Sequence, residues 1–228
     1  MNPRSIVVQQ AAGRPEQLLL LHHGMGGSPE GLVPLARRLA AAFPRATVIN
    51  VAAPHRSGVG EGYEWFSIAG ITEANRVGRV AEAMPGFLAE IRAYQQAADV
   101  TPTVTALVGF SQGAIMSLEA SLAPEAPAGR VVAIAGRFAQ LPAHAPSHTT
   151  IHLLHGKEDA VIPYRHAVEA AIRLRDLGGD VTADILPFVG HAIPEELAEL
   201  AVERLLGHVP KRMWEEALRS ADKLPRAS

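Results

Sequence analysis

A serine, a carboxylate and a histidine, in that order, each follow an apolar segment of this 228-residue chain. They are Ser111, Asp159 and His191. A serine hydroxyl is a weak nucleophile unless a neighbouring base takes its proton, and a carboxylate that holds a histidine in one tautomer completes such a group. The three residues therefore predict acyl transfer through an acyl-serine intermediate, in which His191 acts first as base and then as acid.

The segment around Ser111 is the strongest of these signals. An apolar run, Thr103–Val108, leads into Gly-Phe-Ser-Gln-Gly, and a helical pattern follows at once. A serine on such a sharp strand-to-helix turn has a strained backbone and an exposed hydroxyl, and the helix N-terminus behind it favours developing negative charge. Side chains at Gly109 and Gly113 are expected to collide with the neighbouring strand and helix. The alternative is a plain turn between a strand and a helix.

The choice of Asp159 and His191 rests on their positions after later strands. Among the ten histidines, His191 follows a late apolar run and a glycine, and it precedes a helix that begins with proline and two acids. Asp159 stands in the pattern His-Gly-x-x-Asp-x-x-x-Pro, on a turn before another helix. The alternative acids are Glu158, which is adjacent, and Asp184, which lies within a strand. We expect Asp159 to accept the Nδ1–H of His191 and to stabilise its imidazolium form.

Acyl transfer also needs hydrogen-bond donors for the oxyanion of the tetrahedral intermediate. The glycine-containing segment after the second apolar run, residues 22–27, stands where such a loop belongs. We predict the backbone N–H groups of Met25 and Gln112 as the two donors. A phosphate cradle is the rival interpretation, but a Gly-x-Gly-x-x-Gly motif would need glycine where Pro29 stands.

A long segment without a regular pattern, Pro54–Ile71, contains several aromatic residues close together. Long loops of this composition commonly form lids or pocket walls. We predict Trp65 and Phe66 from this segment, together with Phe188 shortly before His191, as side chains of the substrate pocket. The alternative is an ordered surface loop anchored by Trp65.

Strands and helices must bring these residues together at one edge of a sheet. Runs that are apolar on consecutive positions are typical of central strands covered on both faces. These runs are Ser5–Gln9, Gln17–His22, Thr47–Val51, Thr103–Val108, Arg130–Ala135, Thr150–Leu154 and Val181–Leu186. Segments with apolar residues every three or four positions, as in amphipathic helices, alternate with them. These segments are Pro29–Ala42, Thr72–Ala97, Gln112–Leu122, Pro163–Leu177 and Pro194–Leu206.

This alternation predicts an α/β fold with a mostly parallel, doubly wound sheet, in a single domain of residues 1–228. A short loop rich in glycine and proline joins the first two apolar runs. We therefore expect those two strands to pair as an antiparallel hairpin at one edge of the sheet.

Composition limits the partners and cofactors. The formal net charge of −2, without a basic cluster, argues against a nucleic-acid partner. The absence of cysteine excludes thiolate ligands and fits a reducing compartment, and no His-Glu-x-x-His motif is present, so we expect no metal and no cofactor.

The chain contains no apolar stretch long enough for a secretory signal or a bilayer span. We expect a cytoplasmic protein with a small-molecule ester substrate and no integral membrane association. A homodimer is compatible with the sequence. Residues 210–228 predict one amphipathic helix that covers either the sheet edge or a partner subunit.

Five stretches carry a resemblance to a known family: QLLLLHHGMGGSPEGL, EGYEWFSIAGITEANRVGRV, ALVGFSQGAIMSLEA, TTIHLLHGKEDAVIPYRHAVEA and GGDVTADILPFVGHAI. Together they resemble the carboxylesterase/phospholipase family of α/β-hydrolases, which includes the acyl-protein thioesterases, and within it the bacterial YpfH-type esterases. The resemblance is nearly full length. His22 departs from it, because a smaller or aromatic residue is more typical before the His-Gly pair.

The resemblance implies an α/β-hydrolase fold without a large cap domain and activity on esters with short acyl chains. It also implies Ser111 as nucleophile, Asp159 and His191 as its partners, and Met25 and Gln112 as oxyanion donors. The leading hypothesis is thus a serine hydrolase that cleaves carboxylic esters of short to medium acyl chains.

Two alternatives stay open. A lysophospholipase or acyl-protein thioesterase would need a long apolar acyl channel. A non-catalytic ligand-binding homologue would usually lack a triad member, whereas all three are present here.

Overall fold

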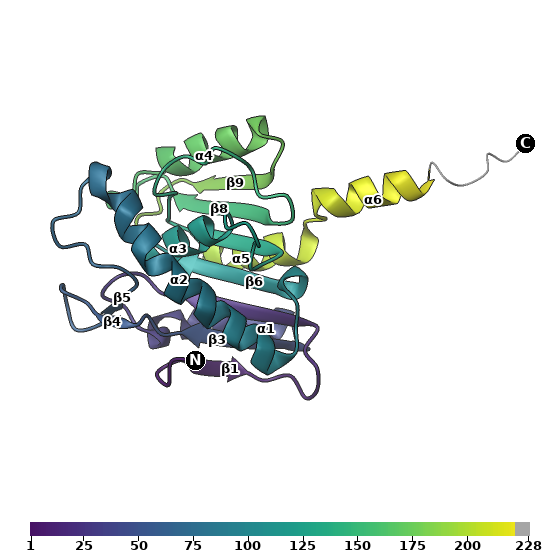
Figure 1. Ribbon diagram of the computed structural model, residues 1–228, viewed down its shortest axis with the longest axis horizontal. Helices are drawn as coiled ribbons and strands as arrows, with labels where there is room; N and C mark the ends of the chain where they lie inside the picture. Colours follow the sequence, from purple (N-terminus) through teal and green to yellow (C-terminus); the bar gives the residue numbers. More distant parts are fainter. Residues whose placement is uncertain (222–228) are drawn as a thin grey trace, which may run out of the picture.

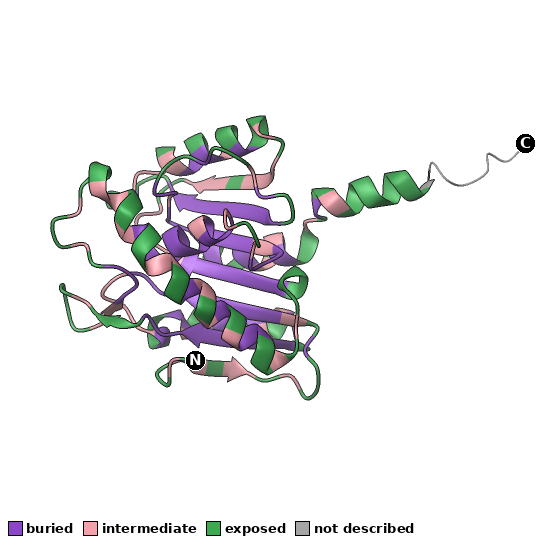
Figure 2. Ribbon diagram, viewed as in Figure 1, coloured by how far each residue is buried: buried purple, intermediate pink, exposed green. Residues whose placement is uncertain are grey.

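A seven-stranded sheet forms the centre of the computed structural model, which describes residues 1–221 (Figure 1). Its strands lie in the order β1-β3-β2-β6-β7-β8-β9, and all but β1 are parallel to their neighbours. The strands are β1 (Ile6–Gln9), β2 (Gln17–His22), β3 (Ala46–Val51), β6 (Thr105–Phe110), β7 (Arg130–Ile134), β8 (Thr150–Gly156) and β9 (Asp180–Leu186). The middle strands are buried along their length, whereas both edge strands are partly exposed (Figure 2). The predicted α/β fold with a mostly parallel sheet is confirmed.

The prediction that the first two strands form a hairpin is wrong. Strand β1 runs antiparallel to β3, with Ile6 opposite Asn50, and β2 lies between β3 and β6, parallel to both. Residues 18–22 of β2 are buried on both faces, whereas the β1 side chains are exposed or half-buried. A strand that is apolar on both faces gains most from an interior position, so the more polar β1 occupies the edge.

Helices cover both faces of the sheet (Figure 1). They are α1 (Val33–Ala42), α2 (Glu73–Ala98), α3 (Gln112–Ala120), α4 (Arg165–Asp176), α5 (Glu195–Gly207) and α6 (Lys211–Ala221), with short 3-10 turns at Pro29–Leu32 and Pro102–Val104. Alternate side chains of β2 serve the two faces: Leu18 and Leu20 pack with α2 and α3, and Leu19 and Leu21 pack with α1 and α5. No helix among residues 1–221 combines the length and apolarity needed to cross a bilayer.

The segment Pro54–Ile71 contains a small antiparallel ribbon that its sequence pattern does not predict. The ribbon consists of β4 (His55–Arg56) and β5 (Tyr63–Glu64). Tyr63 also pairs with the loop after β2: its carbonyl accepts the N–H of Gly26, and its N–H donates to Gly27, both at 2.9 Å. The ribbon therefore lies against the loop in which an oxyanion donor is predicted.

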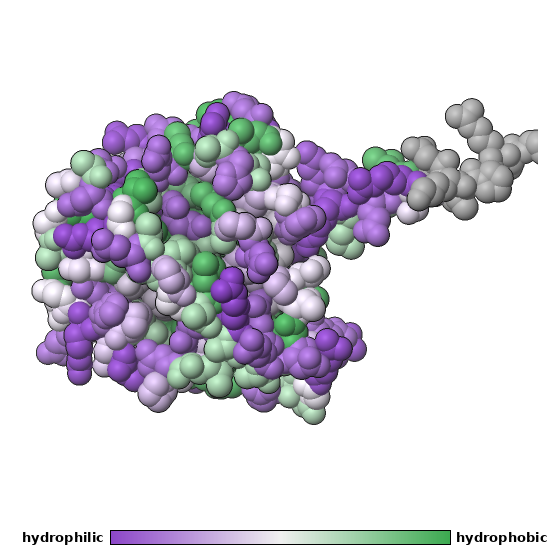
Figure 3. All heavy atoms as spheres, in the orientation of Figure 1, coloured by the Kyte–Doolittle hydropathy of each residue, from purple (hydrophilic) through white to green (hydrophobic). Residues whose placement is uncertain are grey.

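The last helix, α6, extends away from the body instead of covering the sheet edge (Figure 1). Asp180 Oδ2 accepts the backbone N–H of Lys211 at 2.9 Å, which fixes the start of the helix. Residues 222–228, the rest of the predicted C-terminal helix, lie outside the described residues. On the body, the face seen in Figure 3 intersperses hydrophilic and hydrophobic side chains without one large apolar patch.

Candidate active site

Ser111, His191 and Asp159 form one hydrogen-bonded chain. Ser111 Oγ lies 2.9 Å from Nε2 of His191, and Nδ1 of His191 lies 2.7 Å from Oδ2 of Asp159. An ionised carboxylate can only accept, so Nδ1 carries the ring proton and Nε2 presents a lone pair to the serine hydroxyl. The residues follow the carboxyl ends of β6, β9 and β8, the edge of an α/β sheet where ligands bind. This arrangement can take the hydroxyl proton and hold it on an imidazolium that faces a carboxylate.

The backbone at Ser111 is strained as the motif predicts. Its φ of 52° and ψ of −115° place a residue with a side chain in a sparsely populated conformation. A Cβ on Gly109 would meet the backbone of α3, and a Cβ on Gly113 would meet the carbonyl of His22. The expected collisions at both glycines are confirmed. Helix α3 begins at the next residue, Gln112, so its positive end lies behind the hydroxyl.

Two adjoining turns bring Asp159 and His191 together. The backbone N–H groups of Lys157 and Glu158 donate, at 2.8 and 2.9 Å, to the last residue of β9 and to the turn that follows it. The two turns approach so closely that a Cβ on Gly156 would meet a carbonyl of the other turn. Backbone contacts, rather than the side chains alone, therefore hold the carboxylate within reach of the imidazole.

Asp159 is buried and hydrogen-bonded through both carboxylate oxygens. Oδ1 accepts the backbone N–H groups of Val161 and Ile162, each at 2.8 Å, while Oδ2 faces His191. Burial acts to raise the pKa of this carboxyl, but the hydrogen bonds outweigh burial and hold the pKa below its ordinary value. Asp159 is therefore ionised at neutral pH, the state in which it can stabilise an imidazolium.

The loop after β2 lies against Ser111. A Cβ on Gly24 would stand 3.1 Å from the Cβ of Ser111, so only glycine allows this approach without a shift. Met25 and Gln112 directly follow Gly24 and Ser111, so both predicted oxyanion donors border the serine. A position next to the serine is what oxyanion donors require, and the role of these two N–H groups stays a prediction.

His23 anchors this loop. Its Nδ1 lies 2.7 Å from the carbonyl oxygen of Gly24, and its Nε2 lies 3.1 Å from the backbone nitrogen of Ala53. The carbonyl requires a donor and the N–H requires an acceptor, so His23 is the neutral Nδ1–H tautomer. Burial lowers the pKa of His23, which favours the same neutral state.

The Gln112 side chain ties the aromatic segment to the serine turn. Its Oε1 accepts the backbone N–H of Trp65 at 2.8 Å, and its Nε2 donates to the carbonyl of Phe66 at 2.7 Å. The indole N–H of Trp65 donates to the carbonyl of His23 at 2.8 Å. The loop after β2, the aromatic segment and the start of α3 are thus joined in one rigid frame.

Comparison with known proteins identifies the family of this chain. Residues 3–206 match the Phospholipase/Carboxylesterase family. The chain belongs to this family. It is 45% identical to Esterase YpfH of Escherichia coli (strain K12) over 212 residues, which is 93% of this chain and 91% of that protein. It is also 35% identical over 110 residues to Acyl-protein thioesterase 1 of Gibberella zeae, covering 44% of this chain and 47% of that protein.

Solved structures support the same assignment. The crystal structure of esterase PE8 superposes with a TM-score of 0.81 at 28% identity, covering 88% of this chain and 96% of that one. A Bacillus cereus carboxylesterase shares the fold, with a TM-score of 0.73 at 18% identity over 87% and 91% of the two chains. The chain is therefore a carboxylesterase-type hydrolase with an α/β-hydrolase fold, as its sequence resemblance implies.

A cavity of about 340 Å³ opens beside the triad of this carboxylesterase-type hydrolase. Met25, Leu32, Phe110 and Ile193 give it an apolar wall, and His191 lines it as well. The ring of Phe110 lies against the imidazole of His191, with centroids 5.1 Å apart. A group bound in this cavity would contact His191, the residue of the triad that lines it.

None of the three aromatic residues predicted for the substrate pocket lines the cavity beside His191, so their contact with substrate stays a prediction. Trp65 and Phe66 are buried, and they border hollows between the aromatic segment and α2. Phe188 is 87% exposed, at the tip of a turn where its φ is 62°. The aromatic character of Trp65 and Phe66 favours burial, but it does not indicate which cavity their side chains border.

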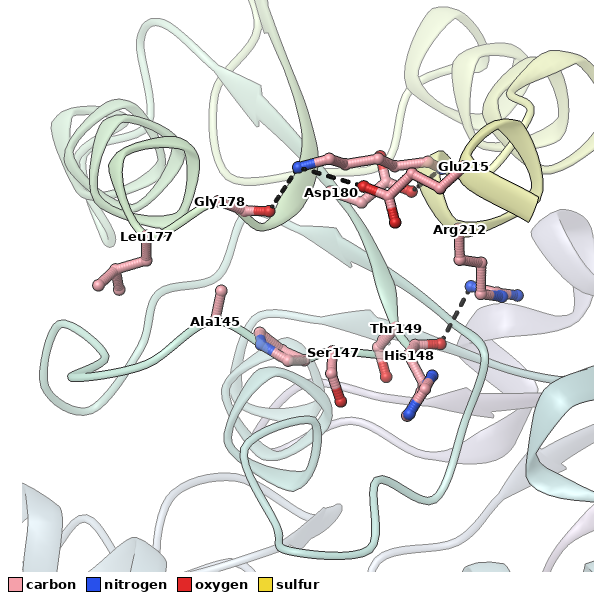
Figure 4. A pocket seen from close by; sticks show the side chains of 11 residues that line it. Ala145, Ser147, His148, Thr149, Leu177, Gly178, Asp180, Arg212 and Glu215 are labelled. Carbon is pink, nitrogen blue, oxygen red and sulfur yellow. Dashed lines mark hydrogen bonds and ion pairs between the residues drawn. The ribbon is translucent and has the colours of Figure 1, made fainter. Parts of the chain in front are cut away.

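A separate hollow of about 270 Å³ lies where α6 leaves the body (Figure 4). Nζ of Lys211 donates to the carbonyl of Gly178 at 2.9 Å, and Arg212 donates to the carbonyl of His148 at 3.0 Å. Asp180 lines this hollow and is the first residue of β9. The hollow therefore lies at the amino ends of the strands, and the triad lies at their carboxyl ends. Nowhere in residues 1–221 do three or more His, Asp or Glu side chains group as a metal site would require.

One residue near the triad was missed by the sequence analysis. His155 is buried on β8, and its Nε2 lies 3.2 Å from Oδ2 of Asp159. The signal was present in the His-Gly-x-x-Asp pattern, which places this histidine four residues before the carboxylate. The apolar run predicted from the sequence ends at Leu154, so the sequence did not show that His155 would be buried within β8.

Proposed function

We propose that this enzyme hydrolyses small carboxylic esters of short to medium acyl chain through an acyl-serine intermediate on Ser111. The hydrogen-bonded chain from Asp159 through His191 to Ser111 is the observation that carries this proposal. Labelling by a fluorophosphonate probe tests it, with the modified peptide identified by mass spectrometry. An active enzyme labelled at a serine other than 111 would contradict the assignment.

The proposed reaction proceeds in two halves. Ser111 Oγ attacks the ester carbonyl carbon while Nε2 of His191 takes the hydroxyl proton, and the N–H groups of Met25 and Gln112 meet the oxyanion. His191 then passes this proton to the departing alkoxide, which leaves as the alcohol. A water molecule, losing its proton to His191, attacks the acyl-serine carbonyl. As the tetrahedral intermediate collapses, His191 returns a proton to Ser111 and the carboxylic acid leaves.

The cavity beside the triad supports a preference for small substrates. Its volume of about 340 Å³ is at the low end of the range of about 300–1,000 Å³ that small-molecule pockets span. We expect p-nitrophenyl esters with short acyl chains to give the highest kcat/KM. Ile193→Trp, which narrows the cavity, should lower kcat/KM for six- to eight-carbon esters by about tenfold relative to the acetate ester.

Phe188→Ala is the matched control, because Phe188 is aromatic and exposed but lies outside the cavity lining. If the dependence of kcat/KM on acyl chain length is unchanged in Ile193→Trp but altered in Phe188→Ala, the substrate binds at the exposed turn and not in the cavity.

Acyl-protein thioesterase activity is the second candidate. The partial likeness to Acyl-protein thioesterase 1 of Gibberella zeae supports it, and an acyl-serine route would serve a thioester equally well. Rates that rise steadily with acyl chain length, on both esters and thioesters, would favour this candidate over a small-ester hydrolase.

We also propose a cytoplasmic homodimer that pairs through α6. Met213, Trp214 and Leu218 are more than half exposed on this helix of 11 residues, a length at which an isolated helix is marginal in water. In an antiparallel pair centred on residue 217, Glu215 of one copy lies opposite Arg219 of the other, so the charges match.

Light scattering should therefore give a mass near twice 24.2 kDa. Trp214→Glu should reduce this to the monomer mass, while Val59→Glu, a change at another exposed apolar residue, should leave the dimer intact. A monomeric wild-type protein would contradict the dimer.

A further inference from the structure

Two imidazoles face the same oxygen of Asp159. Nδ1 of His191 lies 2.7 Å from Oδ2, and Nε2 of His155 lies 3.2 Å from it. Nε2 of His155 also lies 2.7 Å from the carbonyl oxygen of Ile162. His155 is 1% exposed, so it is not placed to contact substrate.

The surroundings of His155 determine where its proton lies. Both atoms facing Nε2 are acceptors, so this nitrogen carries the proton and donates it. The N–H is directed at the carbonyl of Ile162, and its positive end also faces the Asp159 carboxylate. Burial lowers the pKa of His155 more than these two contacts raise it, and the nearby His191 lowers it further. The ring is therefore a neutral donor, which leaves the negative charge of Asp159 available to His191.

The turn that carries Asp159 is held from both sides. The N–H of Ile162 donates to Oδ1 of Asp159, and the carbonyl of Ile162 accepts from His155. Because His155 lies in the buried strand β8, it connects this turn to the rigid sheet. Loss of the His155 N–H would leave the carbonyl of Ile162 without this donor. Among these contacts, Oδ2 of Asp159 would then keep one side-chain donor, His191.

We propose that His155 is a positioning residue, a neutral N–H donor that secures the 159–162 turn and directs Oδ2 of Asp159 at His191. This inference rests on the proposed function, since it acts through the proposed triad. It assigns His155 a role in turnover, and not in substrate binding, because the residue reaches the reacting atoms only through Asp159.

The test compares three variants of the full-length enzyme on a short p-nitrophenyl ester. His155→Leu fills the site without a donor and should lower kcat by about tenfold to a hundredfold with KM unchanged. His155→Gln places an amide N–H near the original Nε2 and should recover most of this loss. His155→Asn, one methylene shorter, keeps the polarity but cannot reach, and it should behave like His155→Leu.

A pH profile adds a measurement that packing alone would not change. Without the His155 donor, the 159–162 turn is held less firmly, and Oδ2 of Asp159 stabilises the protonated form of His191 less well. The acid limb of kcat/KM should then move to lower pH by roughly half a unit in His155→Leu and His155→Asn, but not in His155→Gln. If His155→Leu does not fold, the Gln and Asn pair decides the question, because both replacements are polar amides.

Each outcome is informative. Wild-type kcat and pH profile in His155→Leu or His155→Asn would overturn the inference, as would equal losses in the Gln and Asn variants. In either case, a wild-type enzyme that still hydrolyses the ester and is labelled on Ser111 would leave the proposed function standing. An inactive, unlabelled wild-type enzyme would overturn the proposed function and this inference together.

Discussion

We expect Ser111→Ala to lower kcat for a short p-nitrophenyl ester by on the order of 10⁵- to 10⁶-fold, because a triad acts as a unit and loses nearly all of its effect with one member. His191 would have no hydroxyl to deprotonate at 2.9 Å. The fold should be unaffected, since alanine occupies the same strained turn and adds no atoms. Steady-state kinetics and thermal melting measure the two effects separately.

A double variant sharpens this prediction. If Ser111 and His191 work together, adding His191→Ala to Ser111→Ala should cost little more than the serine change alone. Ser117→Ala is a control within the same helix, because this buried serine donates to the carbonyl of Gly113 and not to the triad. Residual activity within tenfold of wild type in Ser111→Ala would rule out the serine mechanism.

The second large effect is expected from Asp159→Asn. Oδ1 of Asp159 accepts two backbone N–H groups, so an asparagine would keep its carbonyl oxygen there and turn its amide NH₂ toward His191. A donor in that position requires a lone pair on Nδ1 of His191, which moves the ring proton to Nε2. Nε2 would then face Ser111 with an N–H instead of a lone pair, and kcat should fall by about 10⁴-fold.

Glu158→Gln is the matched control for this carboxylate. Glu158 is adjacent in sequence, but it is exposed and makes its contact through the backbone. Its amide variant should keep wild-type kinetics. A large loss of kcat in Glu158→Gln, with wild-type kcat in Asp159→Asn, would show that the wrong acid had been assigned.

The three residues of the proposed triad could be selected from the sequence because their signals are local. The strand, the strained turn and the helix around Ser111 occur within about a dozen residues, and steric conflict at Gly109 and Gly113 accounts for the two glycines. Asp159 and His191 follow strand ends, and parallel strands bring such ends to one edge of a sheet. Neither step requires knowledge of distant contacts.

Strand pairing and pocket lining could not be predicted in the same way. The short loop after β1 is compatible with a hairpin, but pairing with β3 depends on which strand gains more from burial across the whole sheet. The indole N–H of Trp65 donates a hydrogen bond to the carbonyl of His23, and Phe188 lies on an exposed turn. The cavity wall instead comes from Met25, Leu32 and Ile193, which carry no aromatic signal.

The amino-acid order alone indicated the hydrolase family, the serine turn, and the carboxylate and histidine proposed as its partners, because neighbouring residues carry each of these signals. Tertiary structure decided how these groups are held. Hydrogen bonds between the turns after β8 and β9, the hydrogen bonds of the Gln112 side chain with Trp65 and Phe66, and the contact of His155 with Asp159 all contribute. Such contacts depend on the spacing of strands and on which backbone groups remain free at their ends, and folding of the whole sheet sets both.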